Sequence, residues 1–522
     1  MIDTKALRQK ILDLAIRGKL VPQDPDDEPA SVLLERIRQQ KQQMVKEGKL
    51  KPKDIKNDSV IFVGEDNLHY EKFADGSVKC IEDEIPFDLP EGWAWVRLGN
   101  LSAAIQYGLS NSAEPQGTHR LLRITDIQDG EVDWNAVPFT TVNDPEAYLL
   151  KTGDIVFART GATVGKSFLI TETPYPSVYA SYLIRIRLLG SLSPEYIYQF
   201  FDSACYWSQI TDKSVGVGQP NCNGTSLKEL FIPLPPISEQ LRIVPTAQAL
   251  LAYVAKIDAE KKSLLSIIMA TKSKILDLAI RGQLIPQDPN DEPASVLLER
   301  IRAEKEELIK QGKIKRDKKE SVIFRGEDNS YYEKIGTEVR CINSEIPFDL
   351  PETWCWCRLG TLFAHNTGKA LNSADSAGIP MTYITTSNLY WDRFELDSLK
   401  EMLFADSEID KCTVKKGDLL VCEGGDIGRS AIWMFEENIR IQNHIHRLRP
   451  YISLSGRFYY YVMYMWKQLG LIGGQGIGLQ GFSSKMLHNL IVPLPSIDEQ
   501  ERIVAFIDKL FEPIESIEKS LS

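Results

Sequence analysis

The sequence predicts an α+β protein in which two α/β domains with mixed sheets are held by a pair of long antiparallel coiled-coil helices, in a pseudo-two-fold arrangement. Two observations predict this fold class: one long helical pattern in the middle of the chain, and an internal repeat that covers almost the whole sequence. The length of 522 residues also favours several domains over one.

The helical pattern runs from Ser238 to about Gly282. Apolar residues recur along it in steps of three and four, which is typical of a coiled-coil surface. Ser238 can cap the start of the helix and Gly282 can end it. A helix of this length would extend over about 65 Å. We expect Pro245 to kink or fray its first turns.

The same helix occurs a second time, divided between the two ends of the chain. The C-terminal stretch aligns with the first half of the central helix at an offset of 260, which matches Ile503 to Ile243. The N-terminal stretch aligns with the second half at an offset of 264, which matches Lys10 to Lys274, and the string ILDLAIRG recurs unchanged. We infer a ring of two repeats that is cut once within a helix, and we expect the terminal helices to lie end to end.

The repeat divides the chain into framework segments and two divergent domains. Charged amphipathic helices are predicted at Ser31–Lys46 and Ser295–Lys310, and near-identical strands with paired tryptophans follow in 84–99 and 345–360. The predicted segments are an N-terminal framework region (1–92), a first divergent domain (93–236), the central helix (237–283), a second framework region (284–353), a second divergent domain (354–496) and a C-terminal half helix (497–522).

The two divergent domains keep the same order of motifs. Each has a Gly-Asp turn into a strand, a strand with alternating apolar and basic residues, an aromatic-rich helix, a glycine-rich loop and an apolar strand with a Pro-rich turn. The scaffold is shared and the loops differ, which is the pattern expected when one fold carries two different recognition surfaces.

The composition argues against a membrane-spanning protein, a secreted protein and a strongly basic nucleic-acid coat. No apolar run is long enough to span a membrane, and the N-terminus is a charged helix rather than a signal peptide. The eight cysteines have no disulfide-like spacing, so we expect a reduced, cytoplasmic protein. The net charge of −11 argues against a simple basic coat for nucleic acid, so DNA binding would need local basic patches or a partner.

Several of these motifs together carry a family resemblance. The PLPPISEQ and PLPSIDEQ junctions into a long helix, the segments with a Gly-Asp turn, a strand and a GxxG-[KR]S loop, the GQPN loop and the doubled helix resemble the specificity subunit of a type I restriction–modification enzyme. The resemblance covers essentially the whole chain. The stretches 19–92 and 283–353 are longer than a minimal spacer needs, so their role stays open.

The resemblance implies a non-catalytic protein that recognises double-stranded DNA. Each divergent domain would be a target recognition domain that reads one half of a bipartite, asymmetric site. The framework would dock two methyltransferase subunits and, in a restriction complex, two motor–nuclease subunits. S-adenosylmethionine, ATP and Mg are expected on those partner subunits, and no cofactor or metal is expected in this chain.

Candidate DNA-binding residues are the Arg, Lys, His, Asn, Gln, Ser and Thr side chains of the divergent loops. Arg pairs with guanine, and Asn or Gln with adenine, when they reach the major groove. In the first domain they are Ser110, Asn111, His119, Arg120, Arg123, Arg159, Thr160, Lys166, Gln219, Asn221 and Asn223. In the second they are Lys369, Asn372, Thr386, Asn388, Arg429, Gln475, Gln480, Ser483 and Ser484.

Two other functions are weighed against DNA recognition. Gly161–Ser167 resembles a phosphate-binding loop and would suit an NTP-binding enzyme, but it has one residue too few between its glycines. We therefore favour a turn, either facing the DNA backbone or purely structural. The other alternative is an assembly scaffold that reads no DNA. His444 and His446 alternate on a strand, where surface or core residues are commoner than metal ligands. We find no catalytic constellation.

Overall fold

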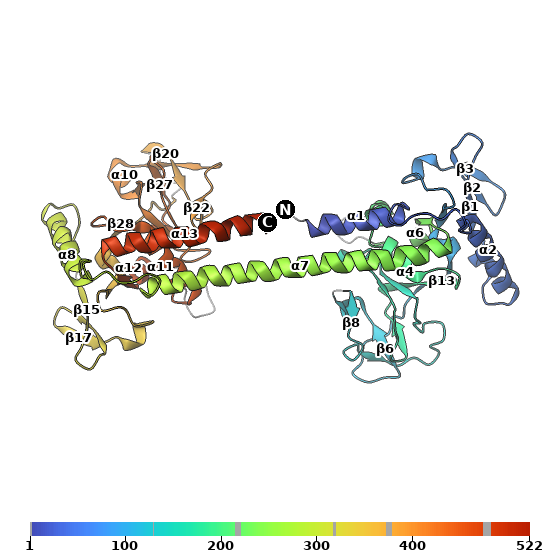
Figure 1. The fold of residues 1–522 in the computed structure, drawn as a ribbon, viewed down its shortest axis with the longest axis horizontal. Helices are drawn as coiled ribbons and strands as arrows, with labels where there is room; N and C mark the ends of the chain where they lie inside the picture. The colour runs from blue at the N-terminus through green and yellow to red at the C-terminus, as the bar shows by residue number, and fades with distance from the viewer. Residues whose placement is uncertain are drawn as a thin grey trace. The chain divides into compact units, whose positions relative to one another are not determined.

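The computed structural model describes residues 3–128, 130–213, 221–316, 320–371, 378–472 and 482–521 (Figure 1). The chain forms two compact units, which divide between Lys261 and Lys262. The boundary lies inside α7 (Ile237–Ile280), a continuous helix of 44 residues. The two units contain nearly the same succession of helices and strands.

Helix α7 confirms the central helix expected from the sequence. It continues through Pro245, so the proline removes one backbone donor without ending the helix. Gly282 follows it with φ +66°, and the amide of Gln283 donates to the carbonyl of Leu278 at 2.8 Å. This is a Schellman C-cap, for which glycine is the favoured residue. Gly18 ends the N-terminal copy of the same string in the same way, with φ +64°.

In the first unit, α1 (Thr4–Ile16) is antiparallel to the first part of α7. The Thr4 hydroxyl donates to Asp258, and Ile11 packs with Ala247 and Val254. The apolar steps predicted from the sequence therefore form the contact between the helices.

In the second unit, α13 (Ile497–Leu521) is antiparallel to the last part of α7. Ile503 and Ile507 join the core around Leu276, and Lys272 pairs with Glu518 at 2.6 Å. Each unit thus has the antiparallel helix pair that was predicted. The expected meeting of the chain ends rests on residues 1 and 522, which lie outside the described residues.

The divergent domain of the first unit has mixed sheets, as predicted. A four-stranded antiparallel sheet has the order β11-β10-β13-β5, and a three-stranded sheet, β12-β6-β9, contains the parallel pair β12-β6. The elements are β4 (Ala94–Arg97), α3 (Leu98–Leu101), β5 (Ser102–Tyr107), β6 (His119–Leu122), β7 (Ile127–Gln128), β8 (Glu131–Val132), β9 (Phe139–Thr140), β10 (Ile155–Ala158), β11 (Ser167–Leu169), β12 (Ser177–Tyr179), β13 (Leu183–Leu188), α4 (Pro194–Phe200), α5 (Ala204–Lys213), α6 (Gly224–Lys228) and β14 (Phe231–Leu234).

The domain of the second unit repeats this plan. The sheet β19-β28-β25-β26 corresponds to the antiparallel sheet, and β23-β20-β27-β24 contains the parallel pair β20-β27. The elements are β18 (Cys355–Arg358), α9 (Leu359–Leu362), β19 (Phe363–Thr367), β20 (Ile379–Ile384), β21 (Leu389–Tyr390), β22 (Arg393–Phe394), β23 (Lys400–Phe404), α10 (Asp406–Cys412), β24 (Thr413–Val414), β25 (Leu419–Cys422), β26 (Ser430–Ile432), β27 (Ile439–Ile441), β28 (Ile445–Pro450), α11 (Gly456–Gln468), α12 (Ser484–His488) and β29 (Ile491–Leu494).

The first and last strands of each divergent domain pair with each other, β4 with β14 and β18 with β29. The last strand leads directly into a long helix, whose first turn is tied back to the domain. In the first unit the indole of Trp93 donates to the Glu239 carboxylate at 2.8 Å, and the Gln240 amide bonds to Ser193 and Pro235. The Glu-Gln dipeptide of the junction motif thus fixes the domain to its helix.

The second unit has the same junction. Trp354 donates to Glu499 at 2.8 Å, and the Gln500 amide bonds to the backbone of Ser455 and Pro495. Burial raises the pKa of Glu499 above its ordinary value, against the lowering effect of its hydrogen bonds. The paired tryptophans are therefore core residues, as the sequence suggested.

Each framework region adds a small module that the sequence analysis did not assign. The predicted helices are present as α2 (Ala30–Lys46) and α8 (Ala294–Lys310). Each is followed by a three-stranded antiparallel sheet that is not predicted from the sequence. The strands are β1 (Ser59–Val63), β2 (His69–Phe73) and β3 (Val78–Cys80) in the first module, and β15 (Ser321–Arg325), β16 (Tyr331–Ile335) and β17 (Glu338–Cys341) in the second.

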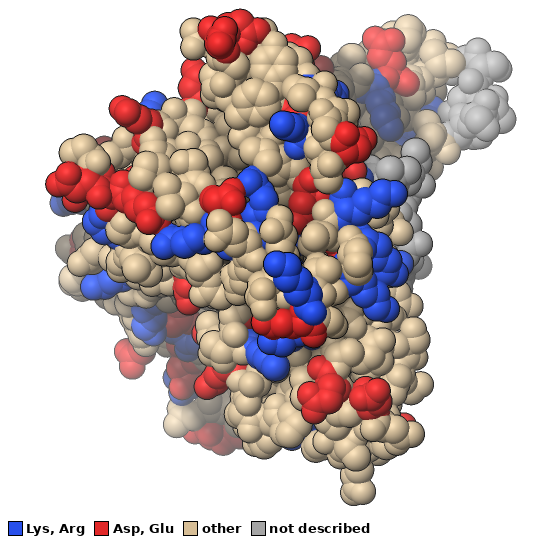
Figure 2. All heavy atoms as spheres, turned by 90° about the vertical axis from the view of Figure 1, so that its right-hand side faces the viewer, with Lys and Arg blue, Asp and Glu red and all other residues tan. Residues whose placement is uncertain are grey.

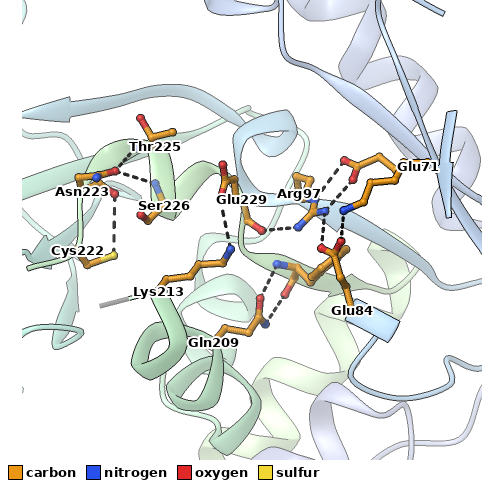
Figure 3. Close-up of polar contacts among 12 residues, drawn as sticks. Glu71, Glu84, Arg97, Gln209, Lys213, Cys222, Asn223, Thr225, Ser226 and Glu229 are labelled. Carbon is orange, nitrogen blue, oxygen red and sulfur yellow. Dashed lines mark hydrogen bonds and ion pairs between the residues drawn. The ribbon is translucent and has the colours of Figure 1, made fainter. Parts of the chain in front are cut away.

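A buried ion pair attaches each module to the first strand of its divergent domain. In the first unit Arg97 binds Glu71 at 2.7 Å and reaches the Glu229 carbonyl at 2.8 Å (Figure 3). In the second unit Arg358 and Arg340 both bind Glu333, whose side chain is 1% exposed. Burial acts to raise the pKa of Glu333, but hydrogen bonds from Ser321 and the two arginines outweigh it, and the pKa falls from 4.5 to about 2.

The Glu333 network predicts a loss of stability in acid. Because the folded pKa is depressed, the contribution is fully present above about pH 4.5 and is lost as the pH falls towards 2. We expect Glu333→Gln to lower the free energy of unfolding of the second unit by about 3 kcal/mol at pH 7. Urea denaturation at several pH values measures this. A difference between wild type and variant that does not shrink between pH 4.5 and pH 2 would contradict it.

Within the described residues, no helix combines the length and the apolar character needed to cross a membrane. All eight cysteines fall in this part of the chain and are free thiols. The described residues also contain no group of three or more His, Cys, Asp or Glu side chains arranged to hold a metal ion.

Candidate nucleic-acid interface

Strand register brings several candidate residues of the first domain to one end of its four-stranded sheet, where neighbouring strands begin or terminate. We call this end of the sheet the edge. Ala158 of β10 lies opposite Leu183 of β13, and Ile184 lies opposite Tyr107 at the end of β5. The ends of these strands therefore meet, although they are far apart in sequence. Arg159 follows β10 directly, and Lys166 directly precedes β11 at the same edge.

Arg159 contacts two exposed tyrosines at this edge. Its backbone amide donates to the carbonyl of Tyr182 at 3.1 Å, and its guanidinium carbon is 4.9 Å from the centre of the Tyr107 ring. The side chain of Tyr182 is 64% exposed. No acceptor among the described residues meets the buried Nε of Arg159. This edge thus presents a half-buried cation packed on one aromatic ring, beside the exposed Tyr182.

The segment before α6 completes the edge. The carbonyl of Arg159 accepts a hydrogen bond from the backbone amide of Cys222. Asn221 and Thr160 form an isolated antiparallel β-bridge. Asn223 caps α6 by accepting from the amides of Thr225 and Ser226, both at 2.9 Å (Figure 3). Lys166 is exposed and forms no ion pair with a described residue. The sequence-predicted residues Arg159, Thr160, Lys166, Asn221 and Asn223 are therefore brought together.

The second domain has the same backbone at this edge with different side chains. Glu423 stands where the first domain has Arg159: its amide donates to the carbonyl of His444 at 2.9 Å, and its carbonyl accepts from Phe482 at 2.8 Å. His444 Nδ1 lies 3.6 Å from the Glu423 carboxylate. Arg429 and Ser483 correspond to Lys166 and Asn223, and Ser483 caps α12 as Asn223 caps α6. The scaffold is repeated while the charge at its centre is reversed.

Arg429 of the second domain also lies on an aromatic ring. Its guanidinium carbon is 4.9 Å from the centre of the Tyr390 ring, and one terminal nitrogen donates to the Thr386 carbonyl. The Arg429 Nε has no acceptor among the described residues. Ser484 lies in the first turn of α12, next to the cap.

The other candidates of the first domain lie beside its three-stranded sheet. Arg120 packs on the rings of Phe139 and Tyr175, at 3.9 and 5.0 Å. Arg123 forms a bidentate pair with Asp126, and this hydrogen bonding raises the pKa of Arg123. The remaining three are Ser110 and Asn111, in the loop between β5 and β6, and His119, the first residue of β6. The structure thus separates the predicted set into two places.

Two predicted residues of the second domain have internal partners. Asn388 is 7% exposed, and its amide bonds to Thr385 and to the carbonyl of Glu395. Lys369 binds the Glu408 carboxylate and the Leu403 carbonyl, both at 2.8 Å. These contacts occupy both side chains and hold the loop together. Gln219, Asn372, Gln475 and Gln480 lie outside the described residues.

The alternating histidines separate into one surface residue and one core residue. His444 is exposed at the sheet edge, whereas His446 is buried and lies 2.9 Å from His365 Nε2 and 2.7 Å from the Phe482 carbonyl. Burial, reinforced by His446, lowers the pKa of His365 to about 3. The pair is therefore neutral at physiological pH and belongs to the core.

The short glycine loops are strand-to-strand turns. Gly161–Thr163 forms a single 3₁₀ turn between β10 and β11, which pair antiparallel, and Gly161 has φ +73°. The equivalent turn joins β25 to β26. A phosphate-binding loop instead opens a helix whose N-terminal amides face the phosphate. Neither turn leads into a helix, so the loops give no support to an NTP-binding enzyme.

The visible charge distribution agrees with the acidic composition. On the face shown in Figure 2, Lys and Arg side chains are interspersed with Asp and Glu, and several cations lie next to one another towards the right of the view. Binding to the phosphate backbone would therefore depend on local groups of cations rather than on a basic coat.

The same edge recurs in both domains with different side chains, which is the arrangement expected of a protein that recognises two different DNA sequences. Comparison with known proteins agrees with this function. The sequence model of the type I restriction modification DNA specificity domain matches residues 90–267 and 351–522, more than half of the chain. The chain belongs to this family. In this chain, Arg159 and Glu423 occupy equivalent positions of the two matched domains.

Individual relatives extend over most of the chain. It is 25% identical over 586 residues to the specificity subunit of the type I restriction enzyme EcoAI of Escherichia coli, which covers 97% of this chain and 89% of that protein. It is 30% identical over 420 residues to the EcoEI specificity subunit of Escherichia coli, covering 69% of this chain and 62% of that protein. Like them, it is a specificity subunit and not an enzyme.

A solved structure supports the fold. A chain from work on complex assembly and conformational transition of the type I restriction–modification system matches with a TM-score of 0.55 and 19% identity, over 84% of this chain and 94% of that one. The two specificity-domain matches include both divergent domains, most of α7 and all of α13, but the modules of β1–β3 and β15–β17 lie outside them.

Proposed function

We propose that each divergent domain reads one half of a bipartite, asymmetric DNA site. The observation that carries this proposal is the sheet edge that recurs with the same backbone hydrogen bonds and with different side chains. A shared backbone gives both domains the same way of approaching a groove. Different side chains give them different bases to select, so the half-sites differ.

The reversed charge at the edge suggests how the half-sites differ. An arginine that reaches the major groove recognises the two acceptors of guanine, whereas a glutamate accepts from the amino group of cytosine. Arg159 can therefore select guanine in one half-site, and Glu423 can select cytosine in the other. Lys166 and Arg429 lie beside them and are suited to phosphate contacts, which position the reader without specifying sequence.

The framework would join this reader to the subunits that carry out the chemistry. We propose that it docks two methyltransferase subunits and, in the restriction complex, two motor–nuclease subunits. Those partners would bind S-adenosylmethionine, ATP and Mg.

Methylation mapping tests the proposal. The chain is expressed with its methyltransferase subunit in a host without this system, and methylated bases are mapped across the genome. A bipartite motif with two different halves is expected. A palindromic motif, or no new methylation although the two subunits form a complex that binds S-adenosylmethionine, would contradict it.

Arg159→Ala tests the edge itself. We expect affinity for the methylated site to fall about 10- to 100-fold, because one bidentate base contact contributes about 1–3 kcal/mol of discrimination. The loss should concern one base pair of one half-site. Competition binding with single-base variants of the site measures this. Arg38→Ala is the control, since Arg38 is an exposed residue of α2; equal losses in the two variants would contradict a specific contact.

A further inference from the structure

The two framework modules expose the same sheet face. In the first module the register of β1, β2 and β3 places Val60 and Phe62 beside Lys72 and Tyr70, with Val78 and Cys80 beyond them. In the second module the corresponding side chains are Val322, Phe324, Lys334, Tyr332, Val339 and Cys341. All six positions carry the same residue type in both modules. We call these two surfaces the outer faces.

The inner faces explain why the outer faces are exposed. Ser59, Ile61 and Glu71 alternate with the outer residues and point to the divergent domain, where Ile61 packs against Ile81 and Trp95. Because successive side chains of a strand point to opposite sides of the sheet, the outer residues face away from this core. Phe62 is 40% exposed and Val78 53%; their counterparts Phe324 and Val339 are 42% and 54% exposed.

The outer faces also agree in local geometry. The rings of Phe62 and Tyr70 stack at 5.9 Å, and so do those of Phe324 and Tyr332. Each tyrosine hydroxyl donates to an aspartate of the preceding turn, Asp66 or Asp328. Other exposed positions of the modules are shared only in part: the turns at 65–67 and 327–329 are identical, whereas Arg325 stands where the first module has Val63. Two identical faces on a chain whose readers diverge indicate one kind of partner, bound twice.

The chemistry of the faces favours a protein partner. Contiguous exposed apolar side chains typically mark protein interaction surfaces. Lys72 and Lys334 are the fourth of five residues of the central strand in their modules, and neither forms an ion pair with a described residue. A single cation within an apolar face suits a partner that brings one carboxylate, whereas a DNA backbone would call for several cations.

The modules are also held firmly enough to position a partner. Arg97 joins Glu71 of the module to β4, and β4 pairs with the strand that leads into α7. Arg358 joins Glu333 to β18 in the same way. A protein seated on an outer face would therefore keep a fixed position relative to the reader of the same unit.

We propose that the two outer faces are duplicate docking sites for the methyltransferase subunit, one copy on each face. This rests on the proposed function, in which the framework joins that subunit to the reader. Each docked subunit presents an apolar surface with a carboxylate opposite Lys72 or Lys334. The long framework segments, whose role the sequence left open, thereby acquire a function.

Stoichiometry tests the proposal. The full chain is copurified with its methyltransferase subunit, and native mass spectrometry gives the number of subunits bound. We expect two on the wild type, one on Lys72→Glu or Lys334→Glu, and none on the double variant. Lys56→Glu and Lys315→Glu are the controls, because these exposed lysines belong to the same modules but lie outside the outer faces; they should retain two.

The exposed thiols provide a second measurement on the unaltered chain. Cys80 and Cys341 lie on the outer faces and are the two exposed cysteines of the eight. Alkylation by a maleimide, followed by peptide mass spectrometry, should be at least tenfold slower at both when the methyltransferase subunit is bound. Unchanged alkylation in a complex with two bound subunits would overturn the docking sites alone.

The remaining outcomes are also decisive. A wild-type chain that binds no methyltransferase subunit would overturn the proposed function together with this inference. A double variant that still binds two subunits would overturn only the inference. A free chain that dimerises, and does so only with Lys72 and Lys334 intact, would assign the outer faces to a second copy of the chain instead.

Discussion

Replacement of residues 99–236 by the corresponding domain of another specificity subunit is expected to change one half of the methylated site and to leave the other half unchanged. The replaced segment begins just after β4 and ends just after β14, and these two strands pair with each other, so the replacement joins at a fixed position. Each mismatched base pair costs about 1–3 kcal/mol, so affinity for the original site should fall on the order of a thousandfold or more.

Methylation mapping of the hybrid measures this result, and the reciprocal hybrid is its control. Replacement of 360–496 should change the opposite half. A hybrid that folds and methylates DNA but alters both halves would show that the two domains do not read independently. Retention of the complete original site would show that the loops between 99 and 236 do not select bases.

Trp354→Ala is expected to give the largest loss of stability. The indole is 6% exposed, packs edge to face on Phe458 and donates to the Glu499 carboxylate at 2.8 Å. Removal of a buried tryptophan typically costs about 3–5 kcal/mol through lost burial and the cavity left behind. The carboxylate of Glu499 also loses one of its donors. We therefore expect the second unit to unfold at markedly lower denaturant concentration.

Trp354→Phe separates packing from hydrogen bonding. It keeps an aromatic ring but removes the N–H, so a loss of about 1–3 kcal/mol is expected from the unsatisfied carboxylate. Urea denaturation followed by tryptophan fluorescence and circular dichroism measures both variants. Trp93→Ala should have the same effect in the first unit, where Trp93 donates to Glu239. Equal stability of Trp354→Ala and wild type would contradict the anchoring role of the indole.

The long elements of the fold could be predicted because their signals are local and repeated. The apolar steps of α7, the recurrence of ILDLAIRG and the charged amphipathic pattern of α2 each lie within one stretch of sequence. The three-stranded modules were missed although SVIFV and SVIFR alternate as strands do and a turn with Asn at positive φ follows each. Their stability comes from pairs such as Glu71 with Arg97, which the sequence alone does not connect.

The candidate interface could be predicted only in part. The divergent loops identified Arg159, Lys166 and Asn223, but the contribution of Tyr107 and Tyr182 depends on strand register. The sequence signal that could have identified these two tyrosines was an aromatic residue at the end of a strand. Polar loop residues such as Asn388 look like surface residues until the fold supplies their partners. Local composition therefore found the right loops, and tertiary contacts decided which side chains remain available.

The duplicated junction between tryptophan, glutamate and glutamine has a consequence for inheritance. Because Trp93 with Glu239 and Trp354 with Glu499 make the same contact, a reader that begins and ends with these motifs fits either position. Recombination within the repeated framework sequence could then exchange readers without disturbing the helices. A population that carries n such readers would have up to n² ordered combinations, so new specificities can arise by shuffling rather than by point mutation.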